Sequence, residues 1–109
     1  MLAKPLRLPA YTRLSHPITI RTEDFILKYT NNNLEYSRFG FIVRKKTDKR
    51  AVVRNRMRRV LRSCIEELFP TIVPGKDMLF LLEKSIIDKQ RQEILQELTE
   101  LFTKRQFLR

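Results

Sequence analysis

The sequence has very few of the residues on which many classes of small protein depend. Among its 109 residues there are one cysteine, one histidine, two glycines and no tryptophan. Cys64 has no disulfide partner within the chain, and together with His16 it cannot supply the ligands of a zinc site. Gly40 and Gly75 are too few for a glycine-rich phosphate loop. A hydrophobic core must therefore stabilise the fold, and the free cysteine indicates a reducing, cytoplasmic environment.

Long hydrophobic runs are also missing. The longest apolar segment, 78–82, is far shorter than the roughly 20 residues that a membrane-spanning helix requires. Pro5 and Pro9 interrupt the N-terminal residues, which contain no apolar segment typical of an export signal. With 42% hydrophobic residues, the chain is nevertheless expected to fold as a single domain over residues 1–109.

Acidic residues are almost absent from one segment. Between Arg44 and Arg62, ten of nineteen residues are Lys or Arg and only Asp48 is acidic, which accounts for +9 of the formal net charge of +11. Charge concentrated in this way indicates a polyanionic partner. Nucleic acid is favoured over an anionic membrane surface, because the apolar positions among these charges are needed for the protein's own core.

The N-terminal third of the chain predicts an arm followed by two strands. Residues 1–22 contain three prolines and are expected to form an irregular arm, with at most a short helical turn around Ala10–Ser15. Apolar and polar side chains alternate over 25–30 and again over 38–44, as in half-buried strands. We expect an antiparallel hairpin that turns at residues 31–33. Its core face would carry Phe25, Leu27, Tyr29, Phe39, Phe41 and Val43.

The hydrophobic period changes at about residue 51. Apolar residues spaced by three or four positions over 51–68 predict an amphipathic helix with Arg54, Arg58 and Arg62 on its polar side. Like charges at this spacing destabilise an isolated helix, so their presence favours an anionic ligand. Cys64 lies on the apolar stripe and is expected to be a core residue rather than a reactive thiol.

The remainder of the chain predicts one more strand and one more helix. In the segment 77–82, Asp77 is followed by five apolar residues in a row, as in a strand covered on both faces. Ser85 and Asp88 resemble a capping box that would begin the final helix. The order strand, strand, basic helix, strand, helix predicts a two-layer α/β sandwich, in which helices pack on one face of a small sheet.

The opposite face of the predicted sheet is a second candidate site. It would present Ile26, Lys28, Thr30, Arg38, Ile42 and Arg44, and it would be open unless the N-terminal arm covers it. Cationic side chains with occasional apolar neighbours suit single-stranded nucleic acid better than a duplex groove. An ordinary solvated sheet face is an equally good interpretation of this pattern.

Catalytic side chains are scarce as well. Asp48 is the only acid in the basic segment, and His16 lies in the proline-containing arm. Glu93, Glu97 and Glu100 recur at helical spacing and look like a solvent-facing surface. No set of nucleophile, base and orienting group can be nominated. Catalysis by these side chains alone is therefore not expected.

Two segments resemble the bacterial ribonuclease P protein subunit. The chain reads Arg-Phe-Gly-Phe-Ile-Val-Arg-Lys-Lys from Arg38 and Ala-Val-Val-Arg-Asn-Arg-Met-Arg-Arg from Ala51. The family has an Arg-x-Gly strand leading into Lys-Lys, a short loop, and Ala-Val-x-Arg-Asn-Arg-x-Lys/Arg-Arg. The resemblance is strong over residues 25–68. It implies a ribosomal-protein-S5-domain-2-like α/β fold with a small mixed sheet and the basic helix in a left-handed crossover, opposite to the general rule.

The resemblance also implies a function. The protein would bind a catalytic RNA and the 5′ leader of precursor tRNA, and would assist Mg²⁺-dependent removal of that leader. The RNA and its bound Mg²⁺ would perform the chemistry, with no metal held by the protein alone and no obligate protein partner. A structural ribosomal or ribosome-assembly protein is the alternative. A DNA-binding regulator is less favoured, because a strand rather than a helix precedes the basic helix.

The family's contact positions can be carried over one by one. Contacts with the RNA subunit are implied for Lys45, Lys46, Lys49, Arg50, Arg54, Asn55, Arg56, Arg58, Arg59 and Arg62. Leader contacts are implied for Lys28, Arg38, Ile42 and Arg44. Asn55 could instead tie down the loop that precedes the helix.

The N-terminus departs from the family pattern. Family members usually begin with a helix that carries an Asp-Phe pair and forms one wall of the leader cleft. In this chain that helix is expected to be shortened or absent. Asp24 and Phe25 resemble the pair but lie at the start of a predicted strand.

Overall fold

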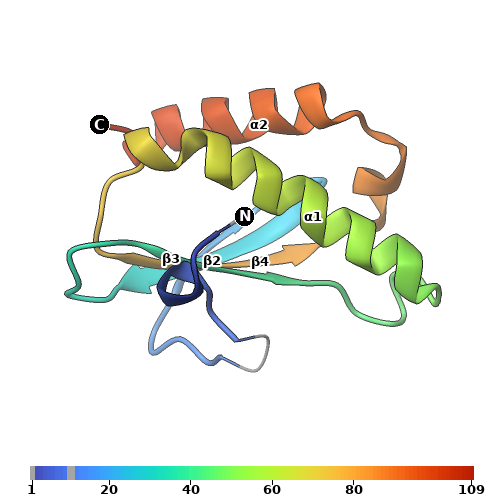
Figure 1. Ribbon diagram of the computed structural model, residues 1–109, viewed down its shortest axis with the longest axis horizontal. Helices are drawn as coiled ribbons and strands as arrows, with labels where there is room; N and C mark the ends of the chain where they lie inside the picture. Colours follow the sequence, from blue (N-terminus) through green and yellow to red (C-terminus); the bar gives the residue numbers. More distant parts are fainter. Residues whose placement is uncertain (1, 10–11) are drawn as a thin grey trace.

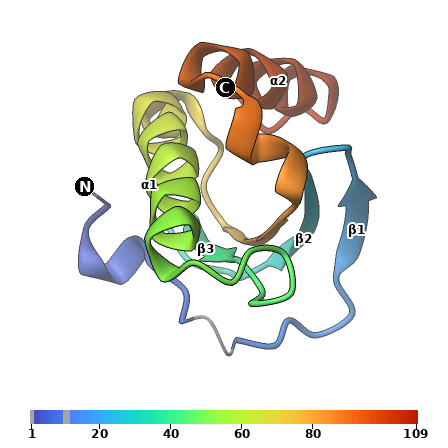
Figure 2. The same ribbon diagram turned by 90° about the vertical axis from the view of Figure 1, so that its right-hand side faces the viewer.

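The computed structural model describes residues 2–9 and 12–109. Two α-helices cover one face of a mixed β-sheet, and the N-terminal segment passes beneath the other face (Figure 1, Figure 2). In chain order the strands and α-helices are β1 (Ile18–Arg21), β2 (Phe25–Asn31), β3 (Arg38–Ile42), α1 (Ala51–Leu68), β4 (Lys76–Leu82) and α2 (Arg91–Lys104). Short 3₁₀ turns lie at Lys4–Leu6, Phe69–Thr71 and Lys84–Asp88. The predicted two-layer α/β sandwich is confirmed.

The strand order is β1-β2-β4-β3, so the predicted hairpin between β2 and β3 is wrong. β4 lies between them, antiparallel to β2 and parallel to β3. Met78 and Phe80 belong to the core beneath the helices whereas Leu79 lies on the opposite face, so β4 needs cover on both faces. The Asn32 backbone N–H donates to the Gly75 carbonyl at 2.9 Å, which ties the segment after β2 to the start of β4.

The connection from β3 through α1 to β4 is left-handed. In Figure 1 the arrow of β4 points to the right, so β4 and the parallel strand β3 run toward the viewer in Figure 2, which shows that side with α1 above the sheet. The strand order places β4 between β3 and β2, to the right of β3 in that view. A right-handed crossover would place β4 on the left. The chain therefore has the uncommon hand that the family resemblance implied, against the general preference.

The core lies between the sheet and the two helices, and Phe80 is at its centre. Its ring centroid is 5.3 Å from that of Phe25, 5.5 Å from that of Phe41 and 6.5 Å from that of Phe102. The predicted core face of the strands is confirmed, except that Tyr29 is only half-buried. Cys64 is fully buried, and burial raises the pKa of its thiol, which agrees with a core role.

The N-terminal arm is more ordered than the sequence suggested. β1 pairs with the outer edge of β2, although only Ile20 among its four side chains is buried. So short an alternation gave no usable signal. The predicted turn at Ala10–Ser15 falls partly outside the described residues, and Thr12–Ser15 contain no helix. A single 3₁₀ turn lies earlier, at Lys4–Leu6. No longer N-terminal helix is found in the described part of the arm.

The final helix begins later than predicted. Ser85 does not cap it, because its hydroxyl donates to the Glu23 carbonyl and to the carboxylate of Asp24. Gln90 is the N-cap instead, and its backbone N–H donates to the carboxylate of Glu93 to complete a capping box. The segment before α2 is therefore free to pack against the start of β2.

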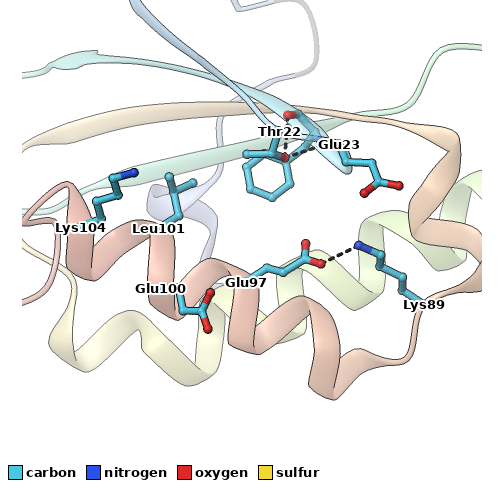
Figure 3. Close-up of a pocket in the computed structure, with 8 residues that line it drawn as sticks. Thr22, Glu23, Lys89, Glu97, Glu100, Leu101 and Lys104 are labelled. Atoms are coloured by element: carbon cyan, nitrogen blue, oxygen red, sulfur yellow. Dashed lines mark hydrogen bonds and ion pairs between the residues drawn. The ribbon is translucent and has the colours of Figure 1, made fainter.

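Asp24 is the centre of a buried ionic network at that contact. Its carboxylate is fully buried and accepts hydrogen bonds from Ser85 at 2.6 Å and from Lys89 Nζ at 2.8 Å. Lys89 Nζ also lies 2.6 Å from Glu97 Oε1 (Figure 3). Burial would raise the pKa of Asp24, but the surrounding side chains of Glu97, Lys89 and Ser85 outweigh it and keep the pKa below its usual value. Asp24 is therefore a structural residue.

Replacing Lys89 with Ala should lower the free energy of unfolding by about 3 kcal/mol, because it leaves the Asp24 carboxylate buried without its cation. Denaturant unfolding at neutral pH measures this loss. The matched change Lys104→Ala removes an exposed cation and should change the free energy by less than about 0.5 kcal/mol.

The loss should depend on pH in a defined direction. Asp24 has a depressed pKa in the folded state, so its stabilising effect is present above the unfolded value of 3.8 and disappears as the pH falls through the folded value. The difference in free energy of unfolding between wild type and Lys89→Ala should decrease below about pH 4. An equal difference in free energy of unfolding at pH 7 and at pH 3 would contradict this account.

Candidate nucleic-acid interface

The apolar stripe of α1 determines which of its side chains face solvent. Val53, Met57, Leu61, Cys64 and Ile65 are buried against the sheet and α2. The opposite side of the helix then carries a hollow of 420 Å³, which we call the α1 hollow. It is lined by Val52, Asn55, Arg58, Arg59 and Arg62. Three cations and one exposed apolar side chain are thus collected on one surface by the packing of the core.

The arginines of the α1 hollow have no acidic partners among the described residues. Burial, together with the positive charges of Arg54 and Arg62, lowers the pKa of Arg58. The guanidinium of Arg62 lies over the ring of Phe41, 5.9 Å from its centroid, which supports it from below. A bound anion would relieve the repulsion within this row, and arginine can hold phosphate oxygens in a bidentate manner.

Four of the predicted RNA-contacting residues form side-chain hydrogen bonds within the protein. The Nε, Nη2 and backbone N–H groups of Arg50 donate hydrogen bonds to the Asp48 carboxylate. These bonds lower the pKa of Asp48 to about 2. Arg54 Nη1 donates to the carbonyl oxygens of Asp48 and Lys49, both at 2.9 Å. Arg54 therefore fixes the loop before α1. That role had been considered for Asn55, whose side-chain oxygen instead accepts a hydrogen bond from Arg58.

The remaining predicted residues divide between two places. Lys45, Lys46 and Lys49 are exposed in the loop before α1, next to the start of the helix. Arg56 lies on the other flank of α1, where it lines a separate hollow with Ile86 and Lys89. The Arg-Asn-Arg motif therefore points in three directions: Arg54 toward the loop, Asn55 into the α1 hollow and Arg56 toward the segment before α2.

The sheet face away from the helices is partly covered by the arm. Thr12, Arg13, Leu14 and Pro17 form one wall of a cleft of 480 Å³, which we call the sheet cleft. The sheet forms its floor, with Ile26, Lys28, Ile42, Leu79 and Leu81. The cleft has an apolar floor with cations at its rim, an arrangement that suits unpaired bases joined by phosphates.

The four predicted leader-binding residues do not share this cleft. Lys28 and Ile42 line it, but Arg38 and Arg44 do not. Arg38 donates from Nε and Nη2 to the Asp77 carboxylate at 2.8 and 2.6 Å, and it keeps the pKa of Asp77 low despite burial. Arg44 lies 3.9 Å from Glu83. Arg13 was not predicted, because nothing in a proline-containing segment indicates which surface it will cross.

A third hollow, beside β2 and α2, differs in charge. Its 350 Å³ are lined by Glu23, Glu97 and Glu100 together with Lys89 and Lys104, and by three further residues (Figure 3). Mixed charges of this kind do not attract a polyanion. The described residues contain no cluster of three or more side chains suited to hold a metal ion. Among them, no helix is long and apolar enough to cross a membrane.

Comparison with known proteins finds a matching family model and relatives of similar sequence. The family model described as Ribonuclease P matches residues 11–106. The chain is 32% identical over 103 residues to the ribonuclease P protein component of Cyanothece sp., a match that covers 94% of this chain and 76% of that protein. It is 40% identical over 68 residues to the component from Microcystis aeruginosa, covering 62% of this chain and 57% of that protein.

Two solved structures share the fold. The ribonuclease P protein of Staphylococcus aureus superposes with a TM-score of 0.79 at 20% identity, over 97% of this chain and all of that one. The protein from Thermotoga maritima gives a TM-score of 0.72 at 22% identity, over 79% of this chain and 81% of that one. The two-layer α/β fold of this chain is therefore shared with these solved structures.

The internal role of Arg54 can be tested without RNA. Arg54→Ala should speed amide hydrogen exchange in residues 48–50 and cost about 1 kcal/mol of stability, because two carbonyl groups lose a charged donor. Arg59→Ala removes an equal charge from the same helix and should leave both quantities nearly unchanged. Equal exchange rates in the two variants would show that Arg54 does not hold the loop.

Proposed function

The chain belongs to the ribonuclease P protein family, and we propose that it acts in the cytoplasm as the protein component of a ribonucleoprotein that removes the 5′ leader from precursor tRNA. The observation that carries this proposal is the group of Arg58, Arg59 and Arg62 on α1, which form no ion pair with an acid among residues 2–9 and 12–109. A folded protein keeps such a row most easily when an anion completes it. The buried, unreactive Cys64 agrees with a reducing compartment.

The first surface would dock the RNA subunit. Lys45, Lys46 and Lys49 lie before α1, and Arg58, Arg59 and Arg62 continue the positive charge along the helix. Arg50 and Arg54 would act indirectly, since they shape the loop that presents the three lysines. Val52, 70% exposed within the same hollow, offers a small apolar contact for a ribose or base.

The second surface would hold the leader. The sheet cleft combines Ile26, Ile42 and Leu81 with cations from Lys28 and Arg13. Bases could lie on the apolar floor while phosphates meet the cations at the rim. The arm would thus supply the second wall in place of the N-terminal helix that the family resemblance implies. Arg38, held by Asp77, would support the sheet rather than contact the strand.

The chemistry is proposed to belong to the RNA subunit and its Mg²⁺ ions. The described side chains do not fit a protein metal site, because no three carboxylates, imidazoles or thiols converge. The two proposed surfaces belong to different layers of the molecule: the first is lined by residues of α1, which lies above the sheet, and the second by residues of the sheet and of the arm beneath it (Figure 2). The protein could therefore bind its RNA and the leader at the same time.

Reconstitution tests the proposal directly. Adding the purified protein to a bacterial ribonuclease P RNA at low Mg²⁺ should stimulate cleavage of precursor tRNA over RNA alone. Arg58→Ala should need more protein to reach the same rate and should reduce the salt slope of RNA binding by about one unit. Lys104→Ala, with the same change in charge on α2, should behave as wild type. RNA binding without any stimulation would favour a structural ribosomal role instead.

The leader surface needs a separate measurement. Lys28→Ala should weaken binding of the assembled ribonucleoprotein to precursor tRNA by about fivefold, because one phosphate contact is lost. The loss should vanish with mature tRNA, which has no leader, and the affinity of the protein for the RNA subunit should not change. An equal loss with both tRNAs would show that the cleft does not contact the leader.

A further inference from the structure

The N-terminal segment brings another arginine next to the basic helix. Leu2 and Leu8 are buried, and the Leu8 backbone N–H donates to the Phe39 carbonyl at 2.7 Å on the free edge of β3. Arg7 forms a parallel bridge with Phe39 at the same edge. Figure 2 shows this segment beside α1, at the opposite edge of the sheet from β1. Residues 2–8 are therefore a docked part of the fold.

Gly40 makes this docking possible. A Cβ at that position would lie 2.5 Å from Leu79 Cδ2, 3.2 Å from Leu8 Cβ and 3.3 Å from the Leu8 carbonyl oxygen. Any larger residue would force the side chain of Leu79 and the backbone of the arm to move. The Arg-x-Gly strand motif thus has a packing role, which fixes the position of the arm relative to β3.

The docked arm places Arg7 and Arg62 in the lining of one small hollow. This edge hollow has a volume of 190 Å³, and residues 39–41 form its floor, with Leu2 and Leu8 beside them. Arg7 Nε donates to the Leu2 carbonyl at 2.9 Å, which orients the guanidinium. Among the described residues nothing accepts from its two terminal nitrogens. Arg62 is held over Phe41 and forms no ion pair with a described residue.

We propose that Arg7 and Arg62 form a phosphate-binding pair that extends the basic row of α1 onto the N-terminal arm. The ligand would be a backbone phosphate of the RNA subunit, so this inference rests on the proposed function. Two oriented guanidinium groups at one hollow repel each other in the absence of an anion, and each offers the planar donors that match phosphate oxygens. The RNA strand would then cross from Arg58 and Arg62 to the edge of β3.

The pair couples two parts of the chain. An RNA that binds Arg7 only in its docked position also stabilises the docking of the arm, since a ligand favours the state that it binds. The arm continues from Arg7 into the wall of the sheet cleft. Binding of the RNA subunit would therefore help to hold the wall that faces the leader.

Substitution of Arg7 provides the test. Arg7→Ala should weaken binding to a ribonuclease P RNA by about fivefold and reduce the salt slope by about one unit. Arg7→Gln can keep a donor for the Leu2 carbonyl but has no charge, and it should lose as much affinity as Arg7→Ala. Lys4→Ala, an exposed cation on the same segment, is the control and should stay within about twofold of wild type. Recovery of binding by Arg7→Gln would overturn the proposal, because it would indicate a structural role.

A double-mutant cycle shows whether the two arginines share one phosphate. In an Arg62→Ala background, Arg7→Ala should cost clearly less than about fivefold, because part of the shared contact is already lost. Strictly additive losses would contradict a shared ligand. If Arg58→Ala lowers the salt slope while both Arg7 variants match Lys4→Ala, the pair is refuted and the proposed function stands. If wild type neither binds the RNA nor stimulates cleavage, the proposed function itself fails.

Discussion

The burial of one narrow stripe of α1 against the sheet is the constraint on which the rest of the molecule depends. Each large apolar side chain in that stripe contributes about 1.5–3 kcal/mol on burial, whereas a like-charge pair at helical spacing costs only a few tenths. The stripe therefore sets the rotation of the helix about its axis, and the arginines lie on the sides of α1 that the stripe leaves exposed. Burial and the positive charges of Arg54 and Arg62 lower the pKa of Arg58, and this arrangement, which follows from the packing of the core, makes the surface receptive to anions.

The same packing separates the two nucleic-acid surfaces. Helices occupy one face of the sheet, so a strand such as β4, which is apolar on both sides, must find cover for its other face. The N-terminal arm provides part of that cover and leaves the sheet cleft between itself and Ile42 and Leu81. Thr12, Arg13, Leu14 and Pro17 thus act as a wall. Earlier in the same arm, Leu8 packs against Gly40 of β3, the strand that carries the Arg-x-Gly motif.

Charge in the sequence and charge available for binding are different quantities in this protein. Arg38, Arg50 and Arg54 all lie within residues 25–68, where the resemblance to the family is strong, yet each is bonded within the chain. Their partners are Asp77 and carbonyl or carboxylate groups of the loop at 48–49. Arg7 and Arg13 gave no signal in the sequence but lie at the edge hollow and the sheet cleft. An electropositive surface therefore cannot be read from the positions of lysine and arginine alone.

Local patterns in the sequence were enough to predict the elements with a strong period, the basic face of α1 and the burial of Cys64, and the segments from Arg38 and from Ala51 indicated the family. These depend on neighbours three or four positions apart or on alternation, which local spacing records. Only the folded chain shows that β4 separates β2 from β3, that the arm crosses beneath the sheet and that Arg7 and Arg62 line one hollow. Such contacts join residues far apart in the chain. They are selected by competition for buried surface, which local spacing does not record.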